Sequence, residues 1–209
     1  MQYFKEKTSM KDKKIFPIIV GVMTMLLIGF VLSQSILATL ILLDWPVSRF
    51  LNNYPVVLCI LAGLIQGLFE EGGRYLAFSK VLKKQTEYRT SLLYGLGHGG
   101  VEFLYTIAVT LTSSLALSAM GVELGVRFML FGAQIAFSVL VFSAVINERK
   151  RYLFWIAFLV HAAIDAFSLA VAREYIDVSI ANQNIIYVLV SIILIVFAIF
   201  TYRTYPQRV

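Results

Sequence analysis

The sequence predicts an all-α fold: a polytopic transmembrane helical bundle of about six helices whose N-terminus is cytoplasmic. Of the 209 residues, 59% are hydrophobic and only 14% are charged, whereas an average soluble domain carries about 25% charged residues. The apolar residues form long blocks instead of alternating with polar residues, which is typical of membrane spans. Basic residues, in turn, gather in alternate polar segments, as cytoplasmic loops do.

Six apolar blocks are long enough to cross the hydrocarbon core of a bilayer, which takes about 20 residues. They cover residues 15–43, 54–79, 91–118, 127–146, 152–172 and 184–202. The first block exceeds one straight span and contains polar residues at 33–35, so we expect it to tilt or break. It is also too long for the hydrophobic region of a signal peptide, which indicates a retained anchor. We interpret residues 1–14 as a basic cytoplasmic tail and residues 15–209 as one transmembrane domain.

The basic residues predict the orientation of the helices. With the N-terminus inside, 14 of the 18 Lys and Arg residues fall in cytoplasmic segments. The external segments hold Arg49, Arg127 and Arg173, and Arg74 lies within a block. This asymmetry follows the positive-inside rule. The net charge of +6 therefore reflects topology and contact with the lipid bilayer, and we expect no nucleic-acid partner. The expected location is a prokaryotic plasma membrane.

Seven ionisable residues interrupt the apolar blocks. They are Glu70, Glu71, Arg74, His98, Glu102, His161 and Asp165. A charged side chain at the centre of a span costs about 2.5–3.5 kcal/mol even on the most lenient scale, so we expect these residues to face inward and to meet one another. Three pairs of these residues are spaced i,i+4, which places the members of each pair on one face of their helix. The pairs are Glu70 and Arg74, His98 and Glu102, and His161 and Asp165.

The depth of these residues in the membrane gives an independent test. Glu70, His98 and His161 each lie nine or ten residues from a basic residue at the cytoplasmic end of their block. At 1.5 Å per residue, all three sit roughly 13–15 Å from the cytoplasmic boundary. Three helices thus bring carboxylates and imidazoles to one level near the middle of the bilayer. Glu102 and Asp165 lie one helical turn deeper than this level.

Several of these residues also have structural explanations. Arg74 is expected to pair with Glu70 or Glu71 and to orient it, while Glu102 and Asp165 can fix the imidazole one turn away. Four glycines around His98, at positions 95, 97, 99 and 100, either allow close helix packing or leave room for a substrate or water. Gln66 and Gln134 are polar residues within spans and stay unassigned. The single cysteine, Cys59, excludes an internal disulfide and a cysteine-based zinc site.

Three motifs carry a family resemblance. FEEGGRYLAF at 69–78, GLGHGGVEFLY at 95–105 and HAAIDAF at 161–167 occur in this order, one in each of three blocks. In this respect the chain resembles the YhfC family of intramembrane proteases, itself similar to a branch of the CAAX-protease and bacteriocin-processing superfamily. The resemblance covers about residues 55–172.

The resemblance implies hydrolysis of a peptide bond within or near the membrane, in a membrane protein or a lipidated peptide. Glu70 or Glu71 would activate water as the general base, and His98 would bind or polarise that water. His161, held by Asp165, would stabilise the oxyanion or protonate the leaving amine. The resemblance favours a mechanism without an obligatory metal. The alternative is a zinc ion held by His98, His161 and Glu70 with an open fourth position.

Two other functions compete with proteolysis. Buried acids and histidines also build the proton relays of transporters and channels, although the chain shows no inverted repeat. A catalytically silent binding or immunity protein could keep the same architecture, but the intact motifs argue against a loss of activity.

Overall fold

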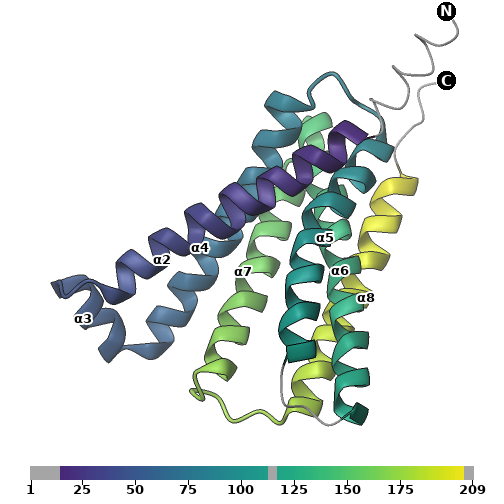
Figure 1. Ribbon diagram of the computed structural model, residues 1–209. Coiled ribbons are helices and arrows are strands. Elements are labelled where there is room, and N and C mark those ends of the chain that lie inside the picture. Colours follow the sequence, from purple (N-terminus) through teal and green to yellow (C-terminus); the bar gives the residue numbers. More distant parts are fainter. Residues whose placement is uncertain (1–14, 113–116, 205–209) are drawn as a thin grey trace, which may run out of the picture.

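The computed structural model describes residues 15–112 and 117–204, and within these residues every regular element is a helix. The predicted tail at 1–14 lies outside the described residues. The long helices run alternately up and down the molecule (Figure 1). The first helix, which starts at Ile15, therefore begins at the same end of the bundle at which the last helix ends, at Arg203. This arrangement confirms the predicted polytopic helical bundle.

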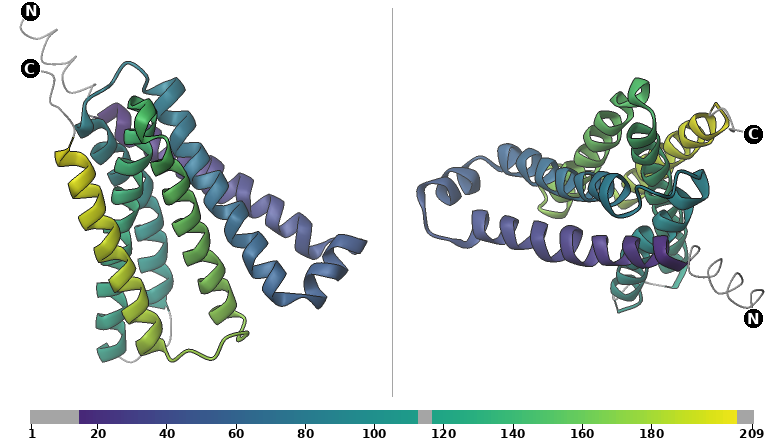
Figure 2. Two further views of the ribbon diagram at one scale, coloured as in Figure 1. Left: turned by 180° about the vertical axis from the view of Figure 1, so that it is seen from behind. Right: turned by 90° about the horizontal axis from the view of Figure 1, so that it is seen from above.

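The first apolar block forms one continuous helix, Ile15–Leu42. It contains the π-helical segment η1 (Met25–Leu32) and continues as α2 (Ser33–Leu42). The helix runs at a slant to the other helices (Figures 1 and 2). This agrees with the predicted tilt, since 28 residues exceed a hydrocarbon core of about 30 Å. The polar residues at 33–35 do not break the helix, because Ser33 and Ser35 donate to backbone carbonyls four residues earlier.

A short polar connection follows this helix and also folds. Residues Pro46–Asn53 form the helix α3, which buries Ser48 and Leu51, and Ser48 Oγ donates to the Leu40 carbonyl at 2.8 Å. Helix α4 (Pro55–Leu76) comes next and ends in the π-helical segment η2 (Ala77–Val81). Both α3 and α4 begin at a proline, which suits the first turn of a helix because its missing N–H has no partner to lose there.

The remaining elements are α5 (Tyr88–Thr112), α6 (Leu117–Ile146), the 3₁₀ turn η3 (Glu148–Lys150), α7 (Tyr152–Ala172) and α8 (Ile180–Arg203). Helix α6 starts ten residues before the predicted block at 127–146, and α8 starts four residues before the predicted block at 184–202. Ser179 caps the N-terminus of α8. Five helices in the described part of the chain are long and apolar enough to cross a membrane. Helix α5 is equally long but is not among these five, because it carries the polar His98 motif and four glycines.

Close backbone contact holds α4 against α7. A Cβ atom at Gly63 would collide with the backbone carbonyl oxygen of Ala162. Only glycine allows this approach, as in small-residue packing between membrane helices. The contact fixes the two helices that carry Glu70 and His161 side by side.

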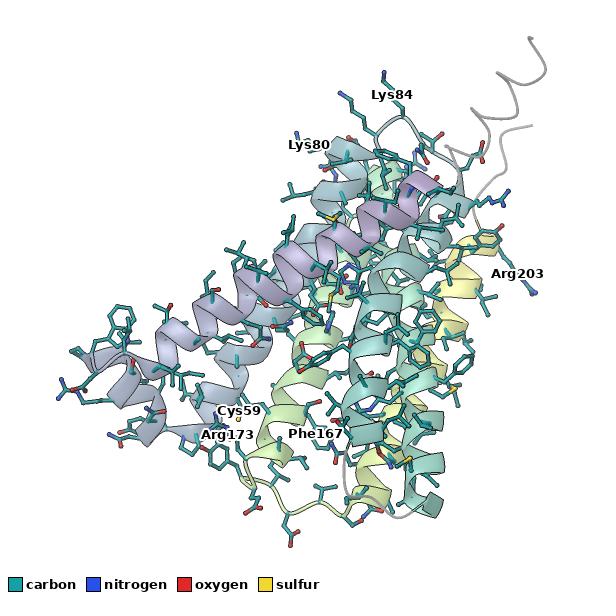
Figure 3. The ribbon with its side chains drawn as sticks, in the orientation of Figure 1. Cys59, Lys80, Lys84, Phe167, Arg173 and Arg203 are labelled. Atoms are coloured by element: carbon teal, nitrogen blue, oxygen red, sulfur yellow. The ribbon has the colours of Figure 1, made fainter. Side chains whose placement is uncertain are left out.

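The two ends of the bundle differ in charge. Lys80, Lys84 and Arg203 lie at one end, and Arg173 lies toward the other (Figure 3). At the first end, Lys150 Nζ donates to Thr204 Oγ1 at 3.3 Å, joining the start of α7 to the end of α8. We call this the basic end, defined by Lys80, Lys84, Lys150 and Arg203.

Reporter fusions test which end faces the cytoplasm. We expect reporters fused after Lys84 and after Arg151 to be active in the cytoplasm, and a reporter fused near Asn182 to be active outside, because the basic end is retained inside. Paired alkaline phosphatase and fluorescent-protein fusions at each position provide the measurement. An external reading at Lys84 would contradict the orientation and the common depth calculated from it.

Candidate active site

Four helices contribute polar side chains to one buried cluster in the middle of the bundle. Helix α4 supplies Glu70, Glu71 and Arg74; α5 supplies His98 and Glu102; α6 supplies Gln134; and α7 supplies His161 and Asp165. The structure thus brings together all seven ionisable residues that the sequence singled out, and it adds Gln134.

Glu70 lies between the two imidazoles. Its Oε2 atom is 3.3 Å from His98 Nε2 and 3.7 Å from His161 Nε2, and 3.8 Å from the Arg74 guanidinium. Its other oxygen accepts a hydrogen bond of 2.8 Å from Gln66 Nε2. The side chain is 3% exposed. One carboxylate oxygen therefore faces both histidines from the interior of the bundle.

Glu71 has a different set of partners. Its Oε1 atom accepts hydrogen bonds from Arg74 and, at 2.6 Å, from His161 Nδ1. Helix spacing alone favoured Glu70 slightly as the partner of Arg74, but the guanidinium binds Glu71 more closely than Glu70. The structure thereby separates the two glutamates: Glu71 anchors Arg74 and His161, and Glu70 faces both imidazole Nε2 atoms.

Both imidazoles are held through their Nδ1 atoms. Glu71 binds Nδ1 of His161, and the hydroxyl of Tyr94 lies 3.4 Å from Nδ1 of His98. The ring of Phe137 stacks on His161 at 4.9 Å with an interplanar angle of 5°. Contacts of this kind fix the tautomer and the orientation of a histidine that binds a metal or a substrate through its other nitrogen.

Gln134 connects the guanidinium of Arg74 to the carboxylate of Glu102. It accepts a hydrogen bond from Arg74 through Oε1 and donates one to Glu102 through Nε2. Glu102 was expected to hold His98, but it accepts its hydrogen bond from Gln134, and Tyr94 takes the position beside His98. The signal for Gln134 was present in the sequence, as an amide within an apolar block, but nothing in the sequence indicated its partners.

Asp165 lies beside His161, as its i,i+4 spacing predicted. Its Oδ2 atom is 3.6 Å from His161 Nε2 and has no hydrogen-bond partner within the described structure. The buried acceptor is therefore free to bind a further group at the edge of the cluster.

The glycines around His98 mainly serve packing. A Cβ atom at Gly97 would collide with the Ile18 carbonyl oxygen, and one at Gly99 would lie 2.7 Å from the Gln134 side chain. The first helix and α6 thus approach α5 closely on two sides of His98. Gly100, in contrast, has open space.

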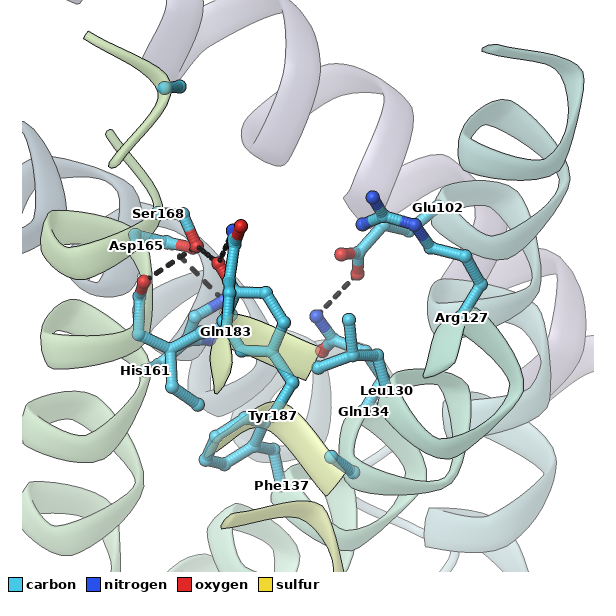
Figure 4. A pocket seen from close by; sticks show the side chains of 13 residues that line it. Glu102, Arg127, Leu130, Gln134, Phe137, His161, Asp165, Ser168, Gln183 and Tyr187 are labelled. Atoms are coloured by element: carbon cyan, nitrogen blue, oxygen red, sulfur yellow. Dashed lines mark hydrogen bonds and ion pairs between the residues drawn. The ribbon is translucent and has the colours of Figure 1, made fainter. Parts of the chain in front are cut away.

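A cavity of about 280 Å³ adjoins the cluster (Figure 4). Its walls come from α5, α6, α7 and α8, and His161, Asp165, Glu102 and Gln134 line it. His161 belongs both to the buried cluster and to the cavity wall. A molecule in the cavity would therefore meet the cluster at four of its residues, His161, Asp165, Glu102 and Gln134.

The sequence also matches a known protein family. The model of the YhfC intramembrane metalloprotease family matches residues 1–125, more than half of the chain. The chain belongs to this family. The match includes the glutamate motif at 69–78 and the histidine motif at 95–105, while His161 and Asp165 of this YhfC-family chain lie beyond it and join the site through their contacts. No curated protein and no solved structure matches the chain.

The donor set of this YhfC-family site fits a zinc ion chemically. Two imidazole Nε2 atoms and one carboxylate oxygen, from His98, His161 and Glu70, are the ligand types of catalytic His₂Glu zinc sites. Both Nδ1 atoms have the outer partners that such ligands commonly have. Within the described residues, no three His, Cys, Asp or Glu side chains form a ready metal-binding cluster. Instead, the Glu70 carboxylate lies directly beside each of the two imidazoles.

The Glu71–Arg74 pair is expected to stabilise the fold. Glu71→Gln should lower the free energy of unfolding by about 3 kcal/mol, at the low end for breaking a buried ion pair because the amide still accepts a hydrogen bond. The matched control is Glu148→Gln, since Glu148 and Arg151 are also spaced i,i+3, at 2.9 Å, but are exposed. That change should cost less than about 1 kcal/mol. Unfolding of the two purified variants in the same detergent measures the difference, and equal losses would contradict the assigned role.

Proposed function

We propose that this protein is an intramembrane endopeptidase that hydrolyses peptide bonds in or near the membrane at the Glu70–His98–His161 cluster. One observation carries the proposal: a single carboxylate oxygen of Glu70 faces the Nε2 atoms of two histidines whose Nδ1 atoms are held by other residues. Membership of the YhfC intramembrane metalloprotease family supports the same reaction.

The reaction adds a water oxygen to the carbonyl carbon, breaks the carbon–nitrogen bond and moves a proton to the leaving amine. Glu70 is suited to receive the proton of the water, because it is buried and its Oε2 atom contacts both imidazoles. A positioned general base of this kind contributes about 10²–10⁴-fold to the rate. His161 lines the cavity next to Asp165, so it is suited to donate a hydrogen bond to the developing oxyanion or a proton to the amine.

The residues around Glu70 and His161 keep these two side chains in position. Glu71 holds His161 at Nδ1, and Arg74 holds Glu71. Gln134 in turn holds Arg74 and Glu102 together. Rigid support matters because a displacement of about 1 Å at a reacting group can cost 10²-fold in rate.

His98, His161 and Glu70 are the residues that would hold zinc. A bound zinc ion would make the water more acidic and polarise the substrate carbonyl. Glu70 is needed in either case, either as the proton acceptor or as part of the ligand set.

A transporter would need a polar path toward both ends of the bundle. The half toward the basic end is filled by a packed core that includes Phe78, Tyr94 and Phe142, with ring centroids of Phe78 4.6 Å from Tyr94 and 5.1 Å from Phe142. This one-sided arrangement favours an enzyme with a closed reaction site over a conducting pathway.

Glu70→Gln tests the reaction. We expect the variant to lose about 10²–10⁴-fold of its turnover and to accumulate in the membrane like the wild type, because a neutral amide is no harder to bury than the acid. Sequencing of new peptide N-termini in membranes that contain wild-type protein or the variant identifies the substrates and measures the loss. Glu148→Gln is the control and should yield the wild-type set of N-termini. Identical sets from wild type and Glu70→Gln would refute proteolysis at this site.

Metal analysis separates the two versions of the site. We expect about one zinc per purified chain, and loss of most of it in His98→Ala and in His161→Ala, because two of the three donors are imidazoles. Elemental analysis after removal of weakly bound metal measures this content independently of activity. A wild-type protein that cleaves substrate and contains no metal would establish hydrolysis by the glutamate and histidines alone.

A further inference from the structure

The cavity beside His161 extends in one direction only. From His161 its lining continues along α7 to Ser168 and Ala172, and it includes Arg127 in the first half of α6 and Gln183 near the start of α8. Eleven residues separate His161 from Ala172, which corresponds to about 16 Å along the helix. All of these residues lie toward the end of the bundle opposite the basic end.

The direction toward the basic end is closed. Tyr88 and Phe142 continue the aromatic core of that half, with ring centroids 5.4 Å apart, and Leu140 and Leu153 are 0% and 1% exposed. Interiors packed in this way leave few voids larger than a water molecule. A peptide could therefore reach His161 along the open cavity without displacing this core.

The lining of the cavity suits a hydrated peptide better than a lipid chain. The Tyr187 hydroxyl is 2.6 Å from Ser168 Oγ and accepts a hydrogen bond of 2.9 Å from Gln183 (Figure 4). Two lining side chains carry buried atoms without a hydrogen-bond partner in the described structure, the donor Arg127 Nε and the acceptor Asp165 Oδ2. A peptide backbone supplies both an acceptor and a donor, and burying either atom unpaired is costly.

From this geometry we infer that the cavity is the binding path of the substrate, and that the substrate is a polypeptide segment exposed at the non-cytoplasmic side of the membrane, next to a span. The inference rests on the proposed protease function. The open end is non-cytoplasmic because the basic residues gather at the other end. A segment outside the hydrocarbon core is extended and hydrated, and it can enter a polar cavity without first unfolding a membrane helix.

Cysteine labelling tests the path, because the chain has a single cysteine that can be removed by Cys59→Ala. In this background, Ser168→Cys places a thiol in the cavity, and Ala172→Cys places one nearer its mouth if the first variant folds poorly. We expect a membrane-impermeant maleimide added to intact cells to label either thiol. The matched control Ser143→Cys lies in the closed half, where Ser143 is fully buried, and should stay unlabelled. Thr86→Cys, in the exposed loop at the basic end, should be labelled only when cells are opened.

Labelling of the cavity variants from the cytoplasmic side alone, or from neither side, would overturn the inference whether or not the protein is a protease. A second measurement links the path to the substrate. A bulky maleimide on Ser168→Cys should reduce cleavage at least tenfold relative to the same variant before labelling, and the same reagent on Thr86→Cys should not. Full cleavage after complete labelling in the cavity would also overturn it. An inactive wild type would instead refute the proposed function, and the labelling result would still report on the path.

Discussion

The buried guanidinium of Arg74 constrains the whole interior of this bundle. The side chain is 0% exposed, and an unpaired charge inside a membrane-protein bundle would cost several kcal/mol. The protein surrounds it with Glu71, Glu70, Gln134 and the ring of Phe137, whose centroid lies 5.7 Å away. Glu70 and Glu71 lie on the same helix as Arg74, whereas Gln134 and Phe137 come from α6. The full set of partners is therefore complete only when α4 and α6 have packed.

The same partners organise the chemistry. Glu71 compensates Arg74 and holds His161, and Phe137 contacts both the guanidinium and the imidazole. The stabilising part of the network and the reactive part are thus neighbouring atoms of the same side chains. Glu70 remains with its Oε2 atom toward both histidines because Arg74 has its closest partner elsewhere. A packing requirement thereby leaves one carboxylate oxygen facing the two histidines.

Much of this could be predicted from the sequence, since a bilayer imposes strong constraints. The apolar blocks, the asymmetry of the basic residues and the common depth of Glu70, His98 and His161 predicted the bundle and the convergence of its polar residues. The pairing of Arg74 with Glu71 was left open, because i,i+3 and i,i+4 spacing are nearly equivalent until rotamers are fixed by neighbours. The role of Gln134, the π-helical segments and the helix at 46–53 depend on contacts between distant segments, which periodicity does not encode.

The orientation of the two imidazoles bears on whether the site holds a metal. The family resemblance favoured a mechanism without an obligatory metal and left zinc as the alternative. The structure adds that both histidines are held at Nδ1 and turn Nε2 toward one carboxylate oxygen, an arrangement that a simple general base does not need. Such an orientation removes the rotational freedom of two imidazoles, and it has a purpose if both rings must act on the same bound species. A water molecule between them, with or without zinc, satisfies that condition. His161 also lines the cavity wall, so a substrate that entered the cavity would meet this imidazole together with Asp165.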